Sequence, residues 1–97
     1  MARDDRDPPD VPLPTGWYWH IEAEGTHGDL KIFAKSKGDN TRCVAQRYQD
    51  GRWIASYMHS RQEMLRTCRS WSDGVPCKDK DEAVALAASY TWLNVGE

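Results

Sequence analysis

The stretch RCVAQRYQDGRWIASYM, which runs from Arg42 to Met58, decides the fold that the sequence predicts. It contains two runs in which apolar and polar residues roughly alternate, joined by Asp50 and Gly51. Asp-Gly between two such runs is a strong hairpin signal, because a type I′ turn needs positive φ at both central positions. We therefore expect an antiparallel hairpin with a two-residue loop.

The length of this loop decides which side chains of the hairpin share a face. A two-residue loop pairs Tyr48 with Trp53 on one face, together with Val44 opposite Tyr57. The other face then holds Cys43, Ala45, Arg47, Ile54, Ser56 and Met58. A sheet that is buried on one side alternates more strictly than this. The hairpin is therefore expected to be covered on both faces or to present aromatic surface to a partner.

Another hairpin precedes this one in the chain. Residues 17–24 and 29–35 both alternate between apolar and polar side chains. Closing the loop between them pairs Ile21 with Ile32, and it also pairs a glutamate with a lysine. Apolar residues then face apolar residues and opposite charges face each other, as cross-strand pairing prefers.

Two helices are expected after the second hairpin. Ser60 and Glu63 have the spacing of a capping box, which predicts a short helix over about residues 61–70. Alternation over residues 65–71 leaves a fifth strand open as the competing interpretation. A longer, Ala-rich helix is expected over residues 83–93, after an Asp-x-x-Glu cap pattern. Its apolar stripe would consist of Ala83, Leu86, Ala87, Tyr90 and Leu93.

The predicted fold class is α+β. Four antiparallel strands in two hairpins should form one sheet, with the long helix and the short helix packed on one face. Residues 1–14 hold four of the five prolines and are expected to form a disordered or extended arm, while residues 15–97 form a single domain. The expected core residues are Trp17, Trp19, Ile21, Leu30, Ile32, Leu86 and Tyr90.

Charge is unevenly distributed along the 97 residues, although the net charge is only −2. Residues 42–69 contain six arginines and two acidic residues, whereas residues 70–97 contain two lysines and five acidic residues. Arginine side chains suit carboxylate and phosphate partners. Without an overall basic excess, broad electrostatic affinity for nucleic acid is not expected.

Cysteine and histidine patterns argue against an enzyme and against a metal site. Cys43, Cys68 and Cys77 are odd in number and widely spaced, so neither a disulfide framework nor a zinc site with paired ligands is expected. The three histidines accompany no nucleophile motif. We expect no cofactor and no metal. The acidic start MARDDRDPPD is unlike a signal peptide, and no apolar run is long enough for a membrane span, so we expect a cytoplasmic protein.

Three resemblances bear on function. The segment GVPCKDKDEAVALAASYTWL, residues 74–93, looks like the closing element of a double-stranded-RNA-binding domain, in which lysines at the helix start hold phosphates; here acidic residues alternate with the lysines. A sheet followed by a helix is similar to the arm-type DNA-binding domains of phage integrases, which read the major groove with the sheet. The short acidic leader, the many Trp and Arg residues and the DEAVALAA helix resemble small accessory proteins of actinobacterial phages. This last resemblance implies a protein that binds and redirects a host or phage protein.

The function expected from the sequence is that of a small, non-enzymatic protein-interaction module. Its partner-binding residues would be Arg47, Tyr48, Arg52 and Trp53, the residue types enriched at interface hot spots. The two aromatic side chains would fill a pocket on the partner and the two arginines would pair with its carboxylates. Nucleic-acid binding through the same hairpin is the alternative, and the sequence leaves open whether Tyr48 and Trp53 are core or surface. It also leaves open a homodimer.

Overall fold

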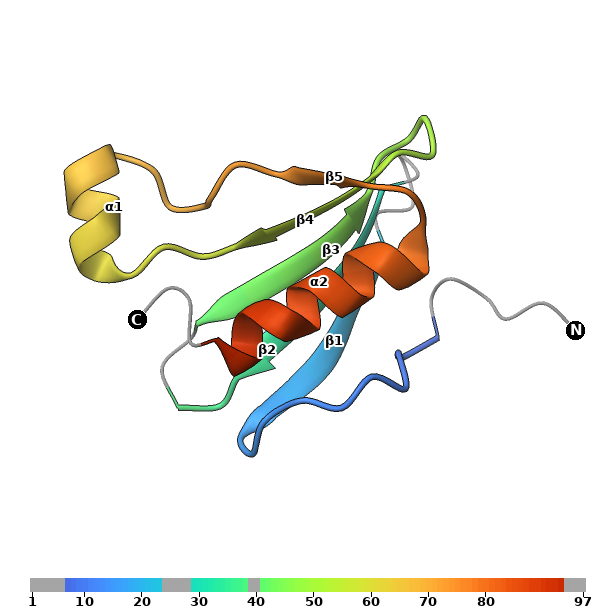
Figure 1. Cartoon of the computed structure of the whole chain (residues 1–97), viewed down its shortest axis with the longest axis horizontal. Coiled ribbons are helices and arrows are strands. Elements are labelled where there is room, and N and C mark those ends of the chain that lie inside the picture. The colour runs from blue at the N-terminus through green and yellow to red at the C-terminus, as the bar shows by residue number, and fades with distance from the viewer. Residues whose placement is uncertain (1–6, 24–28, 39–40, 94–97) are drawn as a thin grey trace, which may run out of the picture.

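A five-stranded antiparallel sheet with one long helix across one of its faces forms the body of the protein (Figure 1). The structure is a computed structural model that describes residues 7–23, 29–38 and 41–93. The elements follow in the order β1 (Trp17–Ala23), β2 (Leu30–Ser36), β3 (Arg42–Arg47), β4 (Trp53–Tyr57), α1 (Arg61–Thr67), β5 (Val75–Cys77) and α2 (Lys80–Trp92). The predicted α+β class is confirmed, with five strands in place of the expected four. Each strand pairs with its neighbour in the chain.

The register of the first hairpin is as expected. Ile21 faces Ile32 and Glu22 faces Lys31 across β1 and β2. The loop between the two strands lies mostly outside the described residues. Pairing by apolar match and by opposite charge therefore predicted this register correctly.

The predicted register of the second hairpin is wrong by one residue. Arg47, not Tyr48, faces Trp53. The loop has three residues, since the backbone N–H of Tyr48 donates to the Arg52 carbonyl at 2.8 Å and Gly51, at φ +89°, lies within it. Three-residue loops commonly end in a left-handed glycine, so Asp-Gly fits this loop as well as the shorter one. The slip places the side chain of Trp53 on the α2 face of the sheet.

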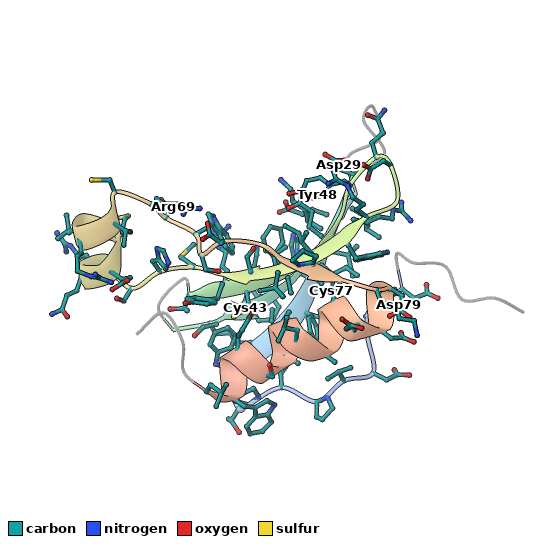
Figure 2. All side chains as sticks on the ribbon, turned by 45° about the horizontal axis from the view of Figure 1, so that its top comes forward. Asp29, Cys43, Tyr48, Arg69, Cys77 and Asp79 are labelled. Atoms are coloured by element: carbon teal, nitrogen blue, oxygen red, sulfur yellow. The ribbon has the colours of Figure 1, made fainter. Side chains whose placement is uncertain are left out.

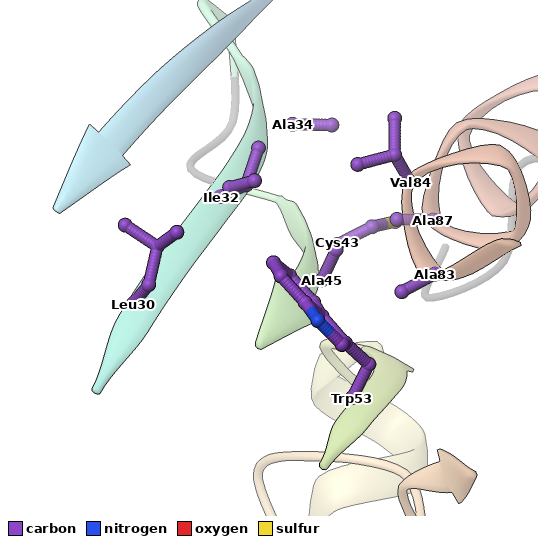
Figure 3. Close-up of a cluster of buried hydrophobic side chains, with 9 residues drawn as sticks. All are labelled: Leu30, Ile32, Ala34, Cys43, Ala45, Trp53, Ala83, Val84 and Ala87. Carbon is purple, nitrogen blue, oxygen red and sulfur yellow. The ribbon is translucent and has the colours of Figure 1, made fainter. Parts of the chain in front are cut away.

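The core lies between α2 and the sheet (Figure 3). Small side chains at the centre of the strands, such as Ala34 and Ala45, allow the helix to approach closely. The central cluster consists of Leu30, Ile32, Ala34, Cys43, Ala45, Trp53, Ala83, Val84 and Ala87. Of the predicted core residues, Leu30 and Ile32 belong to it; Trp17, Trp19, Ile21 and Tyr90 pack against it and stay partly exposed.

Leu86 is absent from this core, because α2 is rotated relative to the predicted stripe. The helix begins at Lys80, three residues before the predicted start at residue 83. Its N-cap is Asp79, whose side chain accepts from the Glu82 N–H at 2.9 Å, as the Asp-x-x-Glu cap pattern predicted. Its buried residues are Ala83, Val84, Ala87, Ala88 and Thr91. Leu93, which the stripe placed inside, is 71% exposed.

The short helix forms where it was expected, but it does not pack on the sheet. The Ser60 hydroxyl accepts from the Glu63 N–H at 3.2 Å, and Cys68 ends the helix in the left-handed conformation. Residues 61–67 are therefore helix and not strand. No residue of α1 is buried, and α1 contacts no other helix or strand of the described chain.

Residues 7–16 contain no helix or strand, and they run alongside β1 and α2 (Figure 1). Val11 and Leu13 pack against the core. The Trp19 indole donates to the Val11 carbonyl at 2.9 Å, and the Trp92 indole donates to the Pro12 carbonyl at 3.2 Å. The first six residues of the predicted arm lie outside the described part of the chain.

Candidate binding surfaces

The face of the sheet opposite α2, here called the open face, is covered by no helix of the described residues (Figure 1). Phe33, Val44 and Ser56 form a row across β2, β3 and β4 and are nevertheless only 5–7% exposed. Trp71, from the segment between α1 and β5, provides part of their cover: its ring centroid lies 6.4 Å from that of Phe33. Because Trp71 pairs with Met58 beyond the end of β4, its indole must reach across the row.

A groove of about 500 Å³ lies on the open face. Phe33 and Trp71 line it together with charged side chains from three strands, Glu22, Lys31 and Arg42. Its remaining lining residues are Val44, Gln46, Tyr48, Ile54, Ser56, Ser72 and Gly74. The groove thus combines aromatic and cationic groups, with one carboxylate among the lining side chains.

Cations outnumber acids on the open face. Lys31, Lys35, Lys37 and Arg42 make no ion pair with any described residue. The cation–π contacts found in the described chain also lie on this face: Lys35 over Phe33 at 5.4 Å, Lys37 over Tyr18 at 6.0 Å, and Arg52 over Tyr48 at 5.4 Å.

The four residues predicted to bind a partner are divided between the two faces of the sheet. Tyr48 and Arg52 lie together at the tip of the second hairpin, and Figure 2 shows Tyr48 on the side away from α2. Arg47 faces Trp53 across the strands on the α2 side. Trp53 is only 7% exposed and belongs to the core, so it presents no surface to a partner. The single patch expected from the sequence is therefore not formed.

Asp50 holds the hairpin tip in place. Its carboxylate accepts from the backbone N–H of Arg52 at 3.1 Å and from the Arg52 Nε at 2.7 Å. These contacts, the backbone bond most of all, lower the pKa of Asp50. The guanidinium of Arg52 is thus directed over the Tyr48 ring in a defined geometry.

Residues 59–70, here called the α1 arm, project from the end of the sheet (Figure 1). The antiparallel backbone pairing that follows β4 continues into the base of the arm, where the His59 N–H donates to the Ser70 carbonyl at 2.8 Å. Leu65 is 71% exposed and Met64 is 37% exposed. Arg66 forms a hydrogen-bonded ion pair with Glu63, which lowers the pKa of that carboxyl.

No group of three His, Cys, Asp or Glu side chains within residues 7–23, 29–38 and 41–93 is placed to hold a metal ion. Burial raises the pKa of Cys43 to about 12, and burial also raises the pKa of Cys77. No helix in the described ranges has the length and apolar character to cross a membrane.

The sequence did not single out Trp71, Lys31 or Lys35 of the open face as site residues. Arg42 was a candidate only through the resemblance to arm-type DNA-binding domains, together with Arg47, Tyr48, Arg52 and Trp53. The grouping on the open face depends on the registers of three strand pairs and on a tryptophan from a distant segment. The alternation of β2 was the available signal, since it placed Lys31 and Lys35 on the face away from Leu30, Ile32 and Ala34.

No protein-family model, curated protein or solved structure matches this chain at a significant level.

Proposed function

We propose that the protein is a non-enzymatic interaction module that docks on another protein through the α1 arm. The observation that carries the proposal is the isolation of α1. The helix is capped at both ends, yet it buries none of its residues and contacts no other helix or strand of the described chain. Helices this short are marginal in water by themselves, so a partner that receives α1 would supply the packing it lacks.

The side chains of the arm define the chemistry of that partner. Leu65 and Met64 offer exposed apolar surface, and the flexible Met side chain adapts to irregular pockets. Arg61 flanks them and is also exposed, whereas the exposed guanidinium of Arg69 already forms an ion pair with Asp73 at 2.6 Å. An amphipathic helix with this composition fits an apolar groove that has carboxylates at its rim.

The resemblance to phage accessory proteins makes a host or phage protein in the bacterial cytoplasm the first class of partner to test. Tyr48 and Arg52 remain part of this proposal as a second contact at the hairpin tip, where both are held together. A second copy of the chain is the competing partner. Size-exclusion chromatography of the purified protein at several concentrations distinguishes a homodimer from a monomer whose partner is a different protein.

The test compares two leucines that are equally exposed. Leu65 and Leu93 are both 71% exposed, so replacing either with alanine should leave the melting temperature within a few degrees of wild type. Alanine also preserves helix propensity in α1. We expect Leu65→Ala to abolish affinity capture of a specific protein from nuclease-treated lysate of the native host, while Leu93→Ala retains it.

With the captured partner purified, Leu65→Ala should weaken binding at least about tenfold, as truncation of a hot-spot residue does. Equal binding by the two variants would show that the arm is not the docking surface.

A further inference from the structure

We propose that the open face of the sheet binds single-stranded nucleic acid. This is a second binding activity, carried by a different surface from the α1 arm. The proposal begins from charge: Lys31, Lys35, Lys37 and Arg42 project from the open face without an ion-pair partner among the described residues. Among the described residues, Glu22, opposite Lys31, is the one carboxylate that lines the groove with Lys31 and Arg42, so positive charge is in excess there. Phosphate groups are among the partners that Lys and Arg bind.

The spacing of these cations suits an extended anion. Lys35 faces Arg42 across β2 and β3, so the two backbones are one strand spacing apart, about 4.8 Å. Lys31 lies four residues from Lys35 along β2, which is about 13 Å. Charges separated in this way can contact successive phosphates along a chain.

Aromatic rings lie among these cations. Tyr18 is 40% exposed, and Tyr48 and Trp71 retain part of their surface in contact with solvent. Phe33 supports Trp71 from beneath, with the ring centroids 6.4 Å apart. Rings on a basic surface are the platforms on which unpaired bases stack.

This combination favours a single strand over a duplex and over an acidic peptide. In a duplex the bases already stack on one another and their faces are not available to Tyr18 or Trp71. An acidic peptide would use the cations but would leave the rings without a function. At the start of α2, on the other side of the sheet, the exposed Asp79, Asp81 and Glu82 outnumber the neighbouring Lys78 and Lys80, so this region should not attract an anion.

The test measures fluorescence anisotropy of a labelled oligo-dT of about 12 nucleotides, a length within the site sizes of such proteins. A labelled oligo-glutamate peptide and a DNA duplex of similar length are the competing probes. We expect the oligo-dT to bind best, with affinity that falls steeply between about 50 and 200 mM salt. Absence of oligo-dT binding at low salt, or equal or tighter binding of the peptide or the duplex, would overturn the proposal.

Matched variants locate the site. Log K falls as log salt rises, with a slope of about −0.7 for each phosphate contact on a single strand. The double variant Lys35→Ala/Arg42→Ala should therefore make this slope shallower by about 1.4. Lys78→Ala/Lys80→Ala removes the same charge next to α2 and should leave the slope unchanged. Tyr18→Ala should weaken oligo-dT binding about tenfold through lost stacking. Equal effects of the two double variants, or no effect of Tyr18→Ala, would exclude a stacking site on the open face.

Discussion

Cys43 lies at the centre of the core between the sheet and α2, with no exposed surface (Figures 2 and 3). Because an apolar environment disfavours the thiolate, burial raises the pKa of Cys43 from 9.0 to about 12. The thiol therefore acts as a small apolar group at ordinary pH. Cys68, by contrast, is exposed at the end of α1.

Cys43 should make the protein less stable at alkaline pH. Below about pH 9 the thiol is protonated in both the folded and the unfolded chain, and it contributes no pH dependence. Between about pH 9 and 12 the unfolded chain releases the proton while the folded chain keeps it. The free energy of unfolding should therefore fall by up to about 1.4 kcal/mol per pH unit from this group.

Urea denaturation of wild type and of Cys43→Ala across this pH range measures the effect. Without the thiol, the free energy of unfolding of the variant should decline less steeply with pH. The decline that remains reflects other groups such as Tyr90, whose pKa is also raised by burial. Identical slopes for the two proteins would refute the assignment to Cys43.

Among the elements, the second hairpin depends most on one backbone conformation. Gly51 has φ +89°, in the region that L side chains rarely adopt. Its conformation closes the three-residue loop and so fixes the register that buries Trp53. Gly38 lies at another turn with ordinary φ, where, among the described residues, an added Cβ would meet only the Ser36 Oγ at 4.0 Å.

We predict that Gly51→Ala destabilises the protein by about 1–2 kcal/mol, the cost of holding an L residue in the left-handed region. Gly38→Ala should change stability by less than about 0.5 kcal/mol. Chemical denaturation of both variants checks the difference. If the two substitutions had equal effects, Gly51 could not be the residue that sets the loop.

The elements also show what the sequence could predict. The first hairpin followed from two independent pairing rules, whereas Asp50-Gly51 satisfies two loop lengths and does not choose between them. Strand β5 escaped prediction because it has three residues, one of them Pro76, which is tolerated at the edge of a sheet. The rotation of α2 was hidden by alanines on several of its sides.

The candidate sites also differ in how much of their geometry could be predicted from the sequence. Tyr48 and Arg52 are local neighbours at one turn, and their contact could be inferred from the hairpin alone. The burial of Trp53 depends on the register and on α2, which lies far along the chain. The cover that Trp71 provides over Phe33 joins segments separated by two strands and a helix, which no local pattern encodes.

At the scale of the whole molecule, the α1 arm extends beyond the layered body of sheet and α2 (Figure 1). The described chain measures 43 × 28 × 23 Å along its principal axes. Met58 still pairs with Trp71, and His59 with Ser70, at the base of the arm. The segments that enter and leave the arm are thus close enough at His59 and Ser70 for a tight turn to join them.

We predict that the fold survives replacement of residues 60–69 by Asn-Gly, which favours a two-residue turn between paired strands. The far-ultraviolet circular dichroism should retain its sheet and α2 signal, and the melting temperature should stay within a few degrees of wild type, because α1 contacts no other helix or strand among the described residues. The shortened protein should lose its protein partner and keep oligonucleotide binding. Loss of cooperative melting would show that the arm stabilises the body of the protein.

The order of the strands has a consequence for how the chain folds. Since every strand pairs with its neighbour in sequence, the sheet can form by successive local closures, which are kinetically fast. The apolar side of that sheet is covered mainly by α2, which follows all five strands in the chain, and in part by Val11 and Leu13. The core is therefore completed only when α2 docks, and a chain interrupted before α2 would expose an aggregation-prone apolar surface.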